Sequence, residues 1–166
     1  MTRFRSGPRP LIVLALLIGL VAVACGGTST PSGSAARSSP SPAAKPVVTT
    51  KTITANGSSV TVLADPKGMT LYYFTPDKGG NVTCSGTCLT AWPPLLLPSG
   101  TSKPTGGGGV TGTLGTVSAS MGTVVTYNGW PLYTYAKDAD KSDGYGDGAA
   151  GGKWLFAKPD IPVTTA

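Results

Sequence analysis

The sequence of 166 residues predicts an all-β protein, mostly antiparallel, with one small domain built from two related β-rich halves. Three observations carry this prediction. A short phrase occurs twice, as LYYFTPD at residues 71–77 and as LYTYAKD at residues 132–138. Segments rich in β-branched and aromatic residues alternate with turn residues along the chain. No segment after residue 25 shows a sustained apolar period of 3.6 residues with helix caps.

Each copy of the phrase follows a turn and a segment that can supply a partner strand. The turns are Asp65–Gly68 and Asn128–Gly129, and Asn-Gly is a strong hairpin signal that also occurs at Asn56–Gly57. Alternate side chains of a strand face opposite sides, so Tyr72 and Phe74 should lie together, away from Leu71 and Tyr73. The expected strands are residues 50–55, 59–64, 69–74, 110–119, 122–127, 131–135 and 153–158.

The two phrases align at an offset of 61 residues, and one residue of slippage then aligns the two later tryptophans. Six correspondences in the same order predict an internal duplication, with copies at about residues 60–97 and 113–158. The aligned pairs are Gly68 with Gly129, Leu71 with Leu132, Tyr72 with Tyr133, Phe74 with Tyr135, Asp77 with Asp138, and Trp92 with Trp154.

The N-terminus has the pattern of an export signal. Arg3, Arg5 and Arg9 precede an uncharged apolar run at residues 11–24, which has 14 residues. A membrane-spanning helix needs roughly 20. A basic segment followed by a short apolar run is typical of a secretory signal peptide, here residues 1–24.

The residues around Cys25 are similar to the lipobox of bacterial lipoproteins. Small side chains at Ala22 and Ala24 precede the cysteine, and Gly26 and Gly27 follow it, although Ala22 stands where leucine is commoner. The resemblance implies that Cys25 is lipidated, with a palmitate-type anchor, and becomes the new N-terminus. The location it implies is the outer face of the bacterial cell membrane, to which the anchor would bind.

Residues 25–50 then form the expected tether, and residues 51–166 the folded domain. The segment from Gly26 to Thr50 consists almost wholly of Gly, Ser, Thr, Pro and Ala, with Arg37 and Lys45 as its charged residues. Such a composition cannot bury enough apolar surface to offset the entropy of ordering, which predicts a disordered linker.

The three cysteines are consistent with an extracytoplasmic location. If Cys25 carries the lipid, Cys84 and Cys88 remain as an even pair, and a disulfide is the usual fate of such a pair outside the cytoplasm. A redox-active or metal-binding thiol pair is the alternative, but CxxxC is not the redox-typical CxxC spacing.

Charge and composition restrict the possible functions. Removing the three arginines of the signal segment from a formal charge of +6 leaves +3 without clusters, so no nucleic-acid-binding stripe is expected. The chain has no His and no Glu, which excludes Ser-His-Asp and Cys-His centres, His-ligated zinc or copper, and CxxCH haem attachment. An Asp77–Asp138 acid and base pair remains formally possible, but we expect no enzyme and no cofactor.

The two copies resemble a known family. Both copies satisfy the pattern Tyr-x-aromatic-x-x-Asp, and the first adds the cysteine pair with Trp-Pro-Pro, whereas the second adds Gly-Trp-Pro-Leu-Tyr with a late tryptophan. These features resemble the secreted repeat of unknown function, a family of predicted bacterial lipoproteins common in actinobacteria. The resemblance implies an envelope location and no established activity.

The motif residues allow a structural and a functional interpretation. In the first, the rings cover a β core and each Asp caps the turn that ends its strand. In the second, the rings stack on a sugar or another flat ligand and the carboxylates accept hydroxyl groups. The candidate residues are Tyr72, Phe74, Asp77, Trp92, Tyr133, Tyr135, Asp138 and Trp154.

Two weaker metal sites are also considered. The acidic loop could offer Ca²⁺ the carboxylates of Asp138, Asp140, Asp143 and Asp147, but Asp143 and Ala149 break the EF-hand pattern. Reduced Cys84 and Cys88 could hold Cu(I) with Met69 and Met121.

From the sequence as a whole we expect a non-catalytic, surface-displayed binding or interaction module for wall polymer or an envelope protein. The alternatives are a purely structural lipoprotein and a metal- or redox-handling protein.

Overall fold

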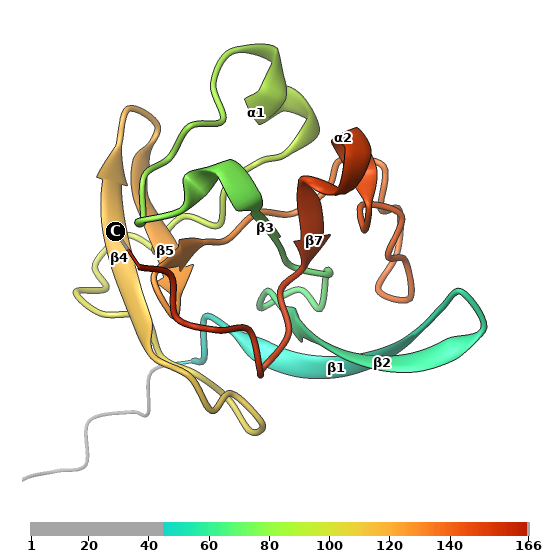
Figure 1. The fold of residues 1–166 in the computed structure, drawn as a ribbon. Helices are drawn as coiled ribbons and strands as arrows, with labels where there is room; N and C mark the ends of the chain where they lie inside the picture. The colour runs from blue at the N-terminus through green and yellow to red at the C-terminus, as the bar shows by residue number, and fades with distance from the viewer. Residues whose placement is uncertain (1–44, 166) are drawn as a thin grey trace, which may run out of the picture. The chain divides into compact units, whose positions relative to one another are not determined.

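The computed structural model describes residues 45–165, so the predicted signal peptide, Cys25 and most of the predicted tether lie outside the described residues. Figure 1 shows the described part as short strands joined by long loops. The strands are β1 (Thr49–Ala55), β2 (Ser58–Ala64), β3 (Tyr72–Phe74), β4 (Leu114–Ala119), β5 (Gly122–Tyr127), β6 (Trp130–Pro131) and β7 (Trp154–Phe156). The helical turns are η1 (Thr75–Asp77), α1 (Thr87–Ala91) and α2 (Ala149–Gly152).

The predicted all-β class is confirmed, because antiparallel strands dominate and the helical segments are single turns. The folded part begins earlier than residue 51, the predicted boundary, which falls inside β1. Val47 and Val48 are buried, and the backbone N–H groups of both donate to the carbonyl of Thr105. The prediction assigned Val47 and Val48 to the linker because the segment before them consists mostly of Gly, Ser, Thr, Pro and Ala. Among the described residues no helix is long and apolar enough to cross a membrane.

Two hairpins form where Asn-Gly pairs predict them. Asn56 and Gly57 join β1 to β2 with φ of 50° and 75°, and Asn128 and Gly129 join β5 to β6 with φ of 50° and 84°. Left-handed backbone at both central positions is the geometry of a type I′ turn, which Asn and Gly tolerate best. A two-stranded sheet (β1–β2) and a three-stranded sheet (β4–β5–β6) result.

The phrase itself is less regular than predicted, and the second copy departs most. Only Tyr72–Phe74 of the expected strand 69–74 forms β3, which pairs with β7 in a third sheet. In the second copy, Tyr133 makes only isolated bridges, to Tyr72 and to Pro94. The partner segment at this point is Pro93–Pro94, and proline has no N–H to donate to a ladder. The expected strand 131–135 is therefore interrupted.

The two copies are intertwined rather than side by side. Strand β7 of the second copy pairs with β3 of the first, and Leu95 of the first copy is bonded into the second. The Leu95 N–H donates to the carbonyl of Leu132 (2.8 Å), as the N–H of Ala157, its counterpart, donates to the carbonyl of Leu71 (2.9 Å). These matched bonds relate the copies by an approximate twofold axis, so each copy completes the other.

The core has a mostly aliphatic cluster and an aromatic cluster, on opposite sides of the repeated phrase. Leu71 and Tyr73 belong to the first and Tyr72 and Phe74 to the second, which confirms the predicted alternation. The buried residues of the aliphatic cluster are Val47, Val48, Leu63, Leu71, Val125, Tyr127, Leu132, Ala157 and Ile161, and Tyr73 packs against them partly buried. Those of the aromatic cluster are Ile53, Val62, Tyr72, Cys84, Trp92, Tyr133, Trp154 and Phe156, and Phe74 packs against them partly buried.

Candidate functional site

The approximate twofold axis passes between the two motif tyrosines. The N–H of Tyr72 donates to the carbonyl of Tyr133 (2.8 Å), and the N–H of Tyr133 donates to the carbonyl of Tyr72 (3.0 Å). Both residues are fully buried. This reciprocal pair of backbone hydrogen bonds brings the two copies of the motif together at the axis.

The motif aspartates are exchanged between the copies. The Tyr72 hydroxyl donates to Oδ2 of Asp138 (2.7 Å), and the Tyr133 hydroxyl donates to Oδ2 of Asp77 (2.5 Å). Asp77 is fully buried and Asp138 is 7% exposed, so both carboxylates need such donors to be buried at acceptable cost. The tyrosine of each copy thus satisfies the aspartate of the other.

The second oxygen of each aspartate holds its own loop. Oδ1 of Asp77 accepts the backbone N–H (2.8 Å) and the hydroxyl (2.6 Å) of Thr83. Oδ1 of Asp138 accepts the N–H of Tyr145 (3.1 Å), and the Tyr72 hydroxyl also accepts the N–H of Gly146 (3.2 Å). Each aspartate therefore connects the loop that follows it to the buried tyrosine of the other copy.

Burial changes the acid–base behaviour of these groups in one direction. Desolvation raises the pKa of Tyr72 and of Tyr133 above the ordinary value, and the hydrogen bonds to Asp138 and Asp77 raise it further. Desolvation also raises the pKa of Asp138, against the lowering effect of the bonds from Tyr72 and Tyr145. Both tyrosines therefore stay protonated and act as donors at neutral pH.

Four aromatic rings stack across the axis. The rings of Trp92 and Trp154 lie 3.8 Å apart and within 3° of parallel. Phe74 stacks on the outer face of Trp154 (4.4 Å), and Tyr135 on the outer face of Trp92 (4.1 Å). The edges of the motif tyrosines close the sides, Tyr72 against Trp92 (5.5 Å) and Tyr133 against Trp154 (5.1 Å). The stack thus obeys the same twofold relation.

This packing determines what the motif residues can contact. The rings of Tyr72, Tyr133, Trp92 and Trp154 are all buried, and both faces of each tryptophan are covered by other rings. They have no free face for a ligand, which corrects the interpretation of these residues as stacking residues. Their placement fits the alternative interpretation as core and turn anchors. Asp77 and Asp138 likewise bind hydroxyl and backbone groups of the chain itself.

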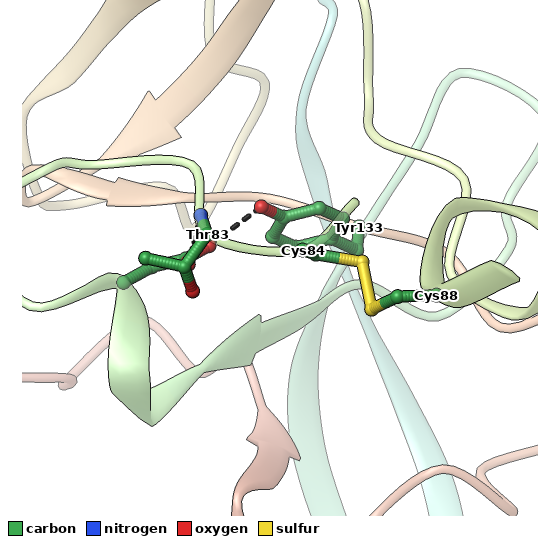
Figure 2. The surroundings of a disulfide bond; sticks show 5 residues. Thr83, Cys84, Cys88 and Tyr133 are labelled. Carbon is green, nitrogen blue, oxygen red and sulfur yellow. Dashed lines mark hydrogen bonds between the residues drawn. A yellow bond between two sulfur atoms is a disulfide. The ribbon is translucent and has the colours of Figure 1, made fainter. Parts of the chain in front are cut away.

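The cysteine pair lies beside one of these anchors. Cys84 and Cys88 are joined as a disulfide, and Figure 2 shows it next to the ring of Tyr133 and close to Thr83. Cys84 is buried within the aromatic cluster, together with Tyr133. With both sulfurs bonded, neither is a thiol ligand for the Cu(I) site considered from the sequence. Met121 lines a small pocket with Cys84, and Met69 does not.

The carboxylates of the acidic loop are spread out and engaged with backbone. Oδ2 of Asp143 accepts the N–H groups of Ala139 and Asp140, and Oδ1 of Asp147 accepts the N–H of Phe156 (2.9 Å). Oδ1 of Asp140 accepts the N–H of Ser142 (2.7 Å). Within residues 45–165, no three Cys or Asp side chains converge as metal ligands would. The loop is thus held by its own carboxylates.

A polar groove opens between this loop and the β1–β2 hairpin. Its volume is about 720 Å³, within the range of 300–1,000 Å³ that is usual for ligand sites. Tyr145 lines it and is 70% exposed, which makes it an exposed aromatic ring beside a hollow. The lining residues are Thr52, Ile53, Thr54, Ala55, Asn56, Ser142, Asp143, Gly144, Tyr145, Asp147 and Phe156.

The fixed distance between loop and hairpin depends on a glycine. A Cβ at Gly144 would come within 2.8 Å of Ile53 in β1 and of Phe156 in β7, so a larger residue here would push the loop or these side chains away. Asp138 and Tyr72 hold the next two residues, Tyr145 and Gly146, by their backbone N–H groups. The motif therefore positions the groove although it does not line it.

Sequence reasoning missed most of this groove. It named Asp143 and Asp147 as weak calcium ligands but passed over Thr52, Thr54 and Tyr145. One signal was present, because Tyr145 stands between Gly144 and Gly146 in a loop, where an aromatic ring has no strand to pack into. The strand residues carry no such signal, since their position at an edge depends on the tertiary structure.

The comparisons with known proteins identify the repeat. The family model described as a secreted repeat of unknown function matches twice, at residues 53–96 and 115–158, which together are just over half of the chain. No curated protein and no solved structure shows significant similarity to the chain. The family description agrees with an extracytoplasmic location. With two matched copies that coincide with the intertwined halves, the chain belongs to the family of secreted repeats of unknown function.

Proposed function

We propose that the protein is a non-catalytic binding module of the cell envelope, and that the groove between the β1–β2 hairpin and residues 142–147 is its ligand site. The observation that carries the proposal is the exposed ring of Tyr145 on the wall of a groove of about 720 Å³. Aromatic rings in that position supply contact area, and the polar groups around them supply specificity.

The chemistry of the groove favours a polar ligand. Asp143 and Asp147 offer carboxylate oxygens, and Ser142, Thr52 and Thr54 offer hydroxyl groups. Wall polymers and extended segments of envelope proteins both present the donors that such a surface accepts. The chain has neither His nor Glu, so the usual nucleophilic and acid–base centres have no residues to form them.

The intertwined core serves the groove as a rigid support. Rigid elements position binding residues more accurately than free loops do. The loop that carries Tyr145 is anchored to the buried Tyr72–Asp138 pair, and Asp147 ties the same loop to β7 through the N–H of Phe156. The duplicated motif thereby contributes to binding through geometry, not through contact with the ligand.

A thermal-shift panel on the mature chain in detergent micelles tests the proposal. The probes are solubilised wall fragments and envelope protein fractions of the source cell. A ligand at a hundredfold excess over its Kd stabilises by about 2.7 kcal/mol, and Tyr145→Ala should abolish the shift. Val163→Ala, a second exposed apolar side chain outside the groove, is the matched control. No shift with any probe, or a shift that Tyr145→Ala leaves intact, would refute the groove as the site.

The anchor belongs to the same proposal. A lipid on Cys25 would hold the module at the outer face of the bacterial membrane, with residues 26–44 as spacer; the small residues around Cys25 support this assignment. Cys25→Ser should move the protein from the membrane fraction to the medium. Mass spectrometry of the wild-type N-terminal peptide should show acyl chains on Cys25. An unmodified peptide that still contains residues 1–24 would remove the anchor.

A further inference from the structure

The outer edge of β1 is only partly covered. The two-residue turn at Asn56–Gly57 makes Ala55 and Ser58 a hydrogen-bonded pair, so alternate residues of β1 bond to β2. Thr50, Thr52 and Thr54 therefore direct their peptide groups away from β2. The bonds at the far end of the hairpin, around Leu63, are consistent with this alternation. Leu63, the partner of Thr50, bonds to Ala157 and Leu71 instead of β1.

Another part of the chain, residues 105–109, covers the beginning of this edge. Gly106 forms a parallel bridge with Val48, and the N–H of Gly107 donates to the Val48 carbonyl (2.8 Å). The Thr50 hydroxyl then donates to the carbonyl of Gly108 (2.9 Å), and Gly109 packs against the same side chain. Within residues 45–165, the backbone N–H and C=O groups of Thr52 and Thr54 have no hydrogen-bond partner.

The uncovered part of the edge borders the groove. Consecutive residues Thr52 to Asn56 line it, which is the arrangement expected when a strand presents its edge to a hollow. Unpaired edge groups are a ready template for another strand. In β-strand addition, main-chain bonds supply affinity and pockets for alternate side chains supply specificity.

The facing wall selects the charge of the added strand. Asp143 and Asp147 line the groove opposite β1. The cation on β1 is Lys51, whose ammonium donates to the carbonyls of Gly68 (2.9 Å) and Lys141. Its single charge interacts with Asp65, Asp138, Asp140 and Asp143 together, so it offsets only part of the negative charge of the wall. An extended segment with Lys or Arg at alternate positions would place its cations on this acidic wall.

We infer that the groove binds an extended, basic peptide segment of an envelope partner, which adds to β1 at Thr52 and Thr54 and continues the line of residues 105–107. This inference deepens the proposed function and rests on it. The inference adds two claims: the ligand is a polypeptide, and the protein recognises the main chain of that polypeptide.

Hydrogen exchange of the mature, lipidated chain tests the inference residue by residue. The probe is the blocked pentapeptide Thr-Lys-Val-Lys-Thr, used up to about 1 mM, the weak end of specific recognition. We expect exchange of the Thr52 and Thr54 amides to slow at least about tenfold at saturation, with the amides of β4 unchanged. The same peptide with alternate amides N-methylated should give no protection, and neither should the peptide with Glu in place of Lys.

Protein variants give an independent readout of main-chain recognition. Thr54→Pro removes one edge N–H and should abolish peptide binding, whereas Thr54→Ala keeps that N–H and should retain it. If Thr54→Pro does not fold, the N-methylated probe still decides the question, because it leaves the protein intact.

The outcomes separate this inference from the proposed function. Wall glycan that binds through Tyr145 without protecting Thr52 and Thr54 would leave the groove as a binding site and overturn the peptide. Equal binding of the parent and N-methylated peptides, or no protection up to the highest concentration, would also overturn it. Failure of peptide, wall fragments and envelope fractions alike would overturn both.

Discussion

The loops that follow the two motif aspartates occupy equivalent places and are closed by different chemistry. Residues 78–91 of the first copy carry the Cys84–Cys88 disulfide. In the second copy, Gly146 and Ala150 stand at the corresponding positions, and carboxylates bonded to backbone N–H groups replace the covalent link. Each loop ends in a single helical turn, α1 or α2, in Figure 1. One frame therefore tolerates a covalent or a polar closure. The hollow beside the polar loop is the larger, about 720 Å³ against about 320 Å³ beside the disulfide loop.

A second contrast shows why the carboxylate sits where it does. The N–H of Phe156 in β7 is satisfied by Asp147 (2.9 Å). In the first copy, Pro94 takes the place of Phe156 and Ser85 the place of Asp147. Proline has no N–H, so no acceptor is needed there. The acidic character of the second loop thus follows in part from a backbone donor that the first copy does not have.

The largest expected effect tests whether the core is symmetric. Trp92→Ala and Trp154→Ala should each lower the free energy of unfolding by about 3–5 kcal/mol, because each removes a buried ring from the same stack. The two losses, measured by urea denaturation, should agree within about 1 kcal/mol. Trp130→Ala, outside the stack and only partly buried, should cost less. A large inequality between the two stack variants would contradict the twofold relation.

The next effect distinguishes the two Tyr–Asp pairs. Tyr133→Phe leaves one oxygen of buried Asp77 without its donor and should cost about 2 kcal/mol. Tyr72→Phe deprives both Asp138 and the N–H of Gly146 and should cost about 3 kcal/mol.

A double-mutant cycle checks the cause of both losses. Tyr133→Phe combined with Asp77→Asn, and Tyr72→Phe combined with Asp138→Asn, should each show coupling because these residues are hydrogen-bonded. The same Tyr→Phe variants combined with Asn at the aspartate of their own copy should show none. Coupling within a copy instead of between copies would contradict the exchanged arrangement.

The disulfide should matter less, and only in its own loop. The double variant Cys84→Ser, Cys88→Ser should lose about 2 kcal/mol on the chain-entropy model for so short a loop. Faster hydrogen exchange should be confined to residues 78–91, with residues 139–153 unchanged. Thiol titration of the wild-type protein from the secretory route should find neither residue free. Two free thiols would revive the redox and metal alternative.

The smallest expected effect is a pH dependence of stability that comes from Asp138. Burial raises the pKa of Asp138, so the folded state holds its proton more tightly than the unfolded state. The stability from this group is complete below the ordinary pKa of about 4 and declines as pH rises through the raised value. Asp138→Asn should flatten that decline in urea denaturation curves. If Asp138→Asn showed the same decline as the wild-type protein, another group would be responsible for it.

Much of the fold was predictable because its signals are local. The two Asn-Gly turns, the strands before them and the alternation of Leu71 with Tyr72 each depend on a few neighbouring residues. The duplication was also readable, since it needs only order and spacing. The interruption at Tyr133 was not, because its cause, Pro93–Pro94, lies about forty residues away along the chain, and nothing local names it as the partner.

By itself, the sequence determined the β class, the repeat and its family, and a composition without His or Glu. Only the tertiary structure decided that each motif tyrosine serves the other copy's aspartate, and that the rings are core while an open strand edge faces Tyr145. The physical reason is that propensity and alternation act between near neighbours, whereas burial and pairing are properties of segments that meet only after the chain has folded.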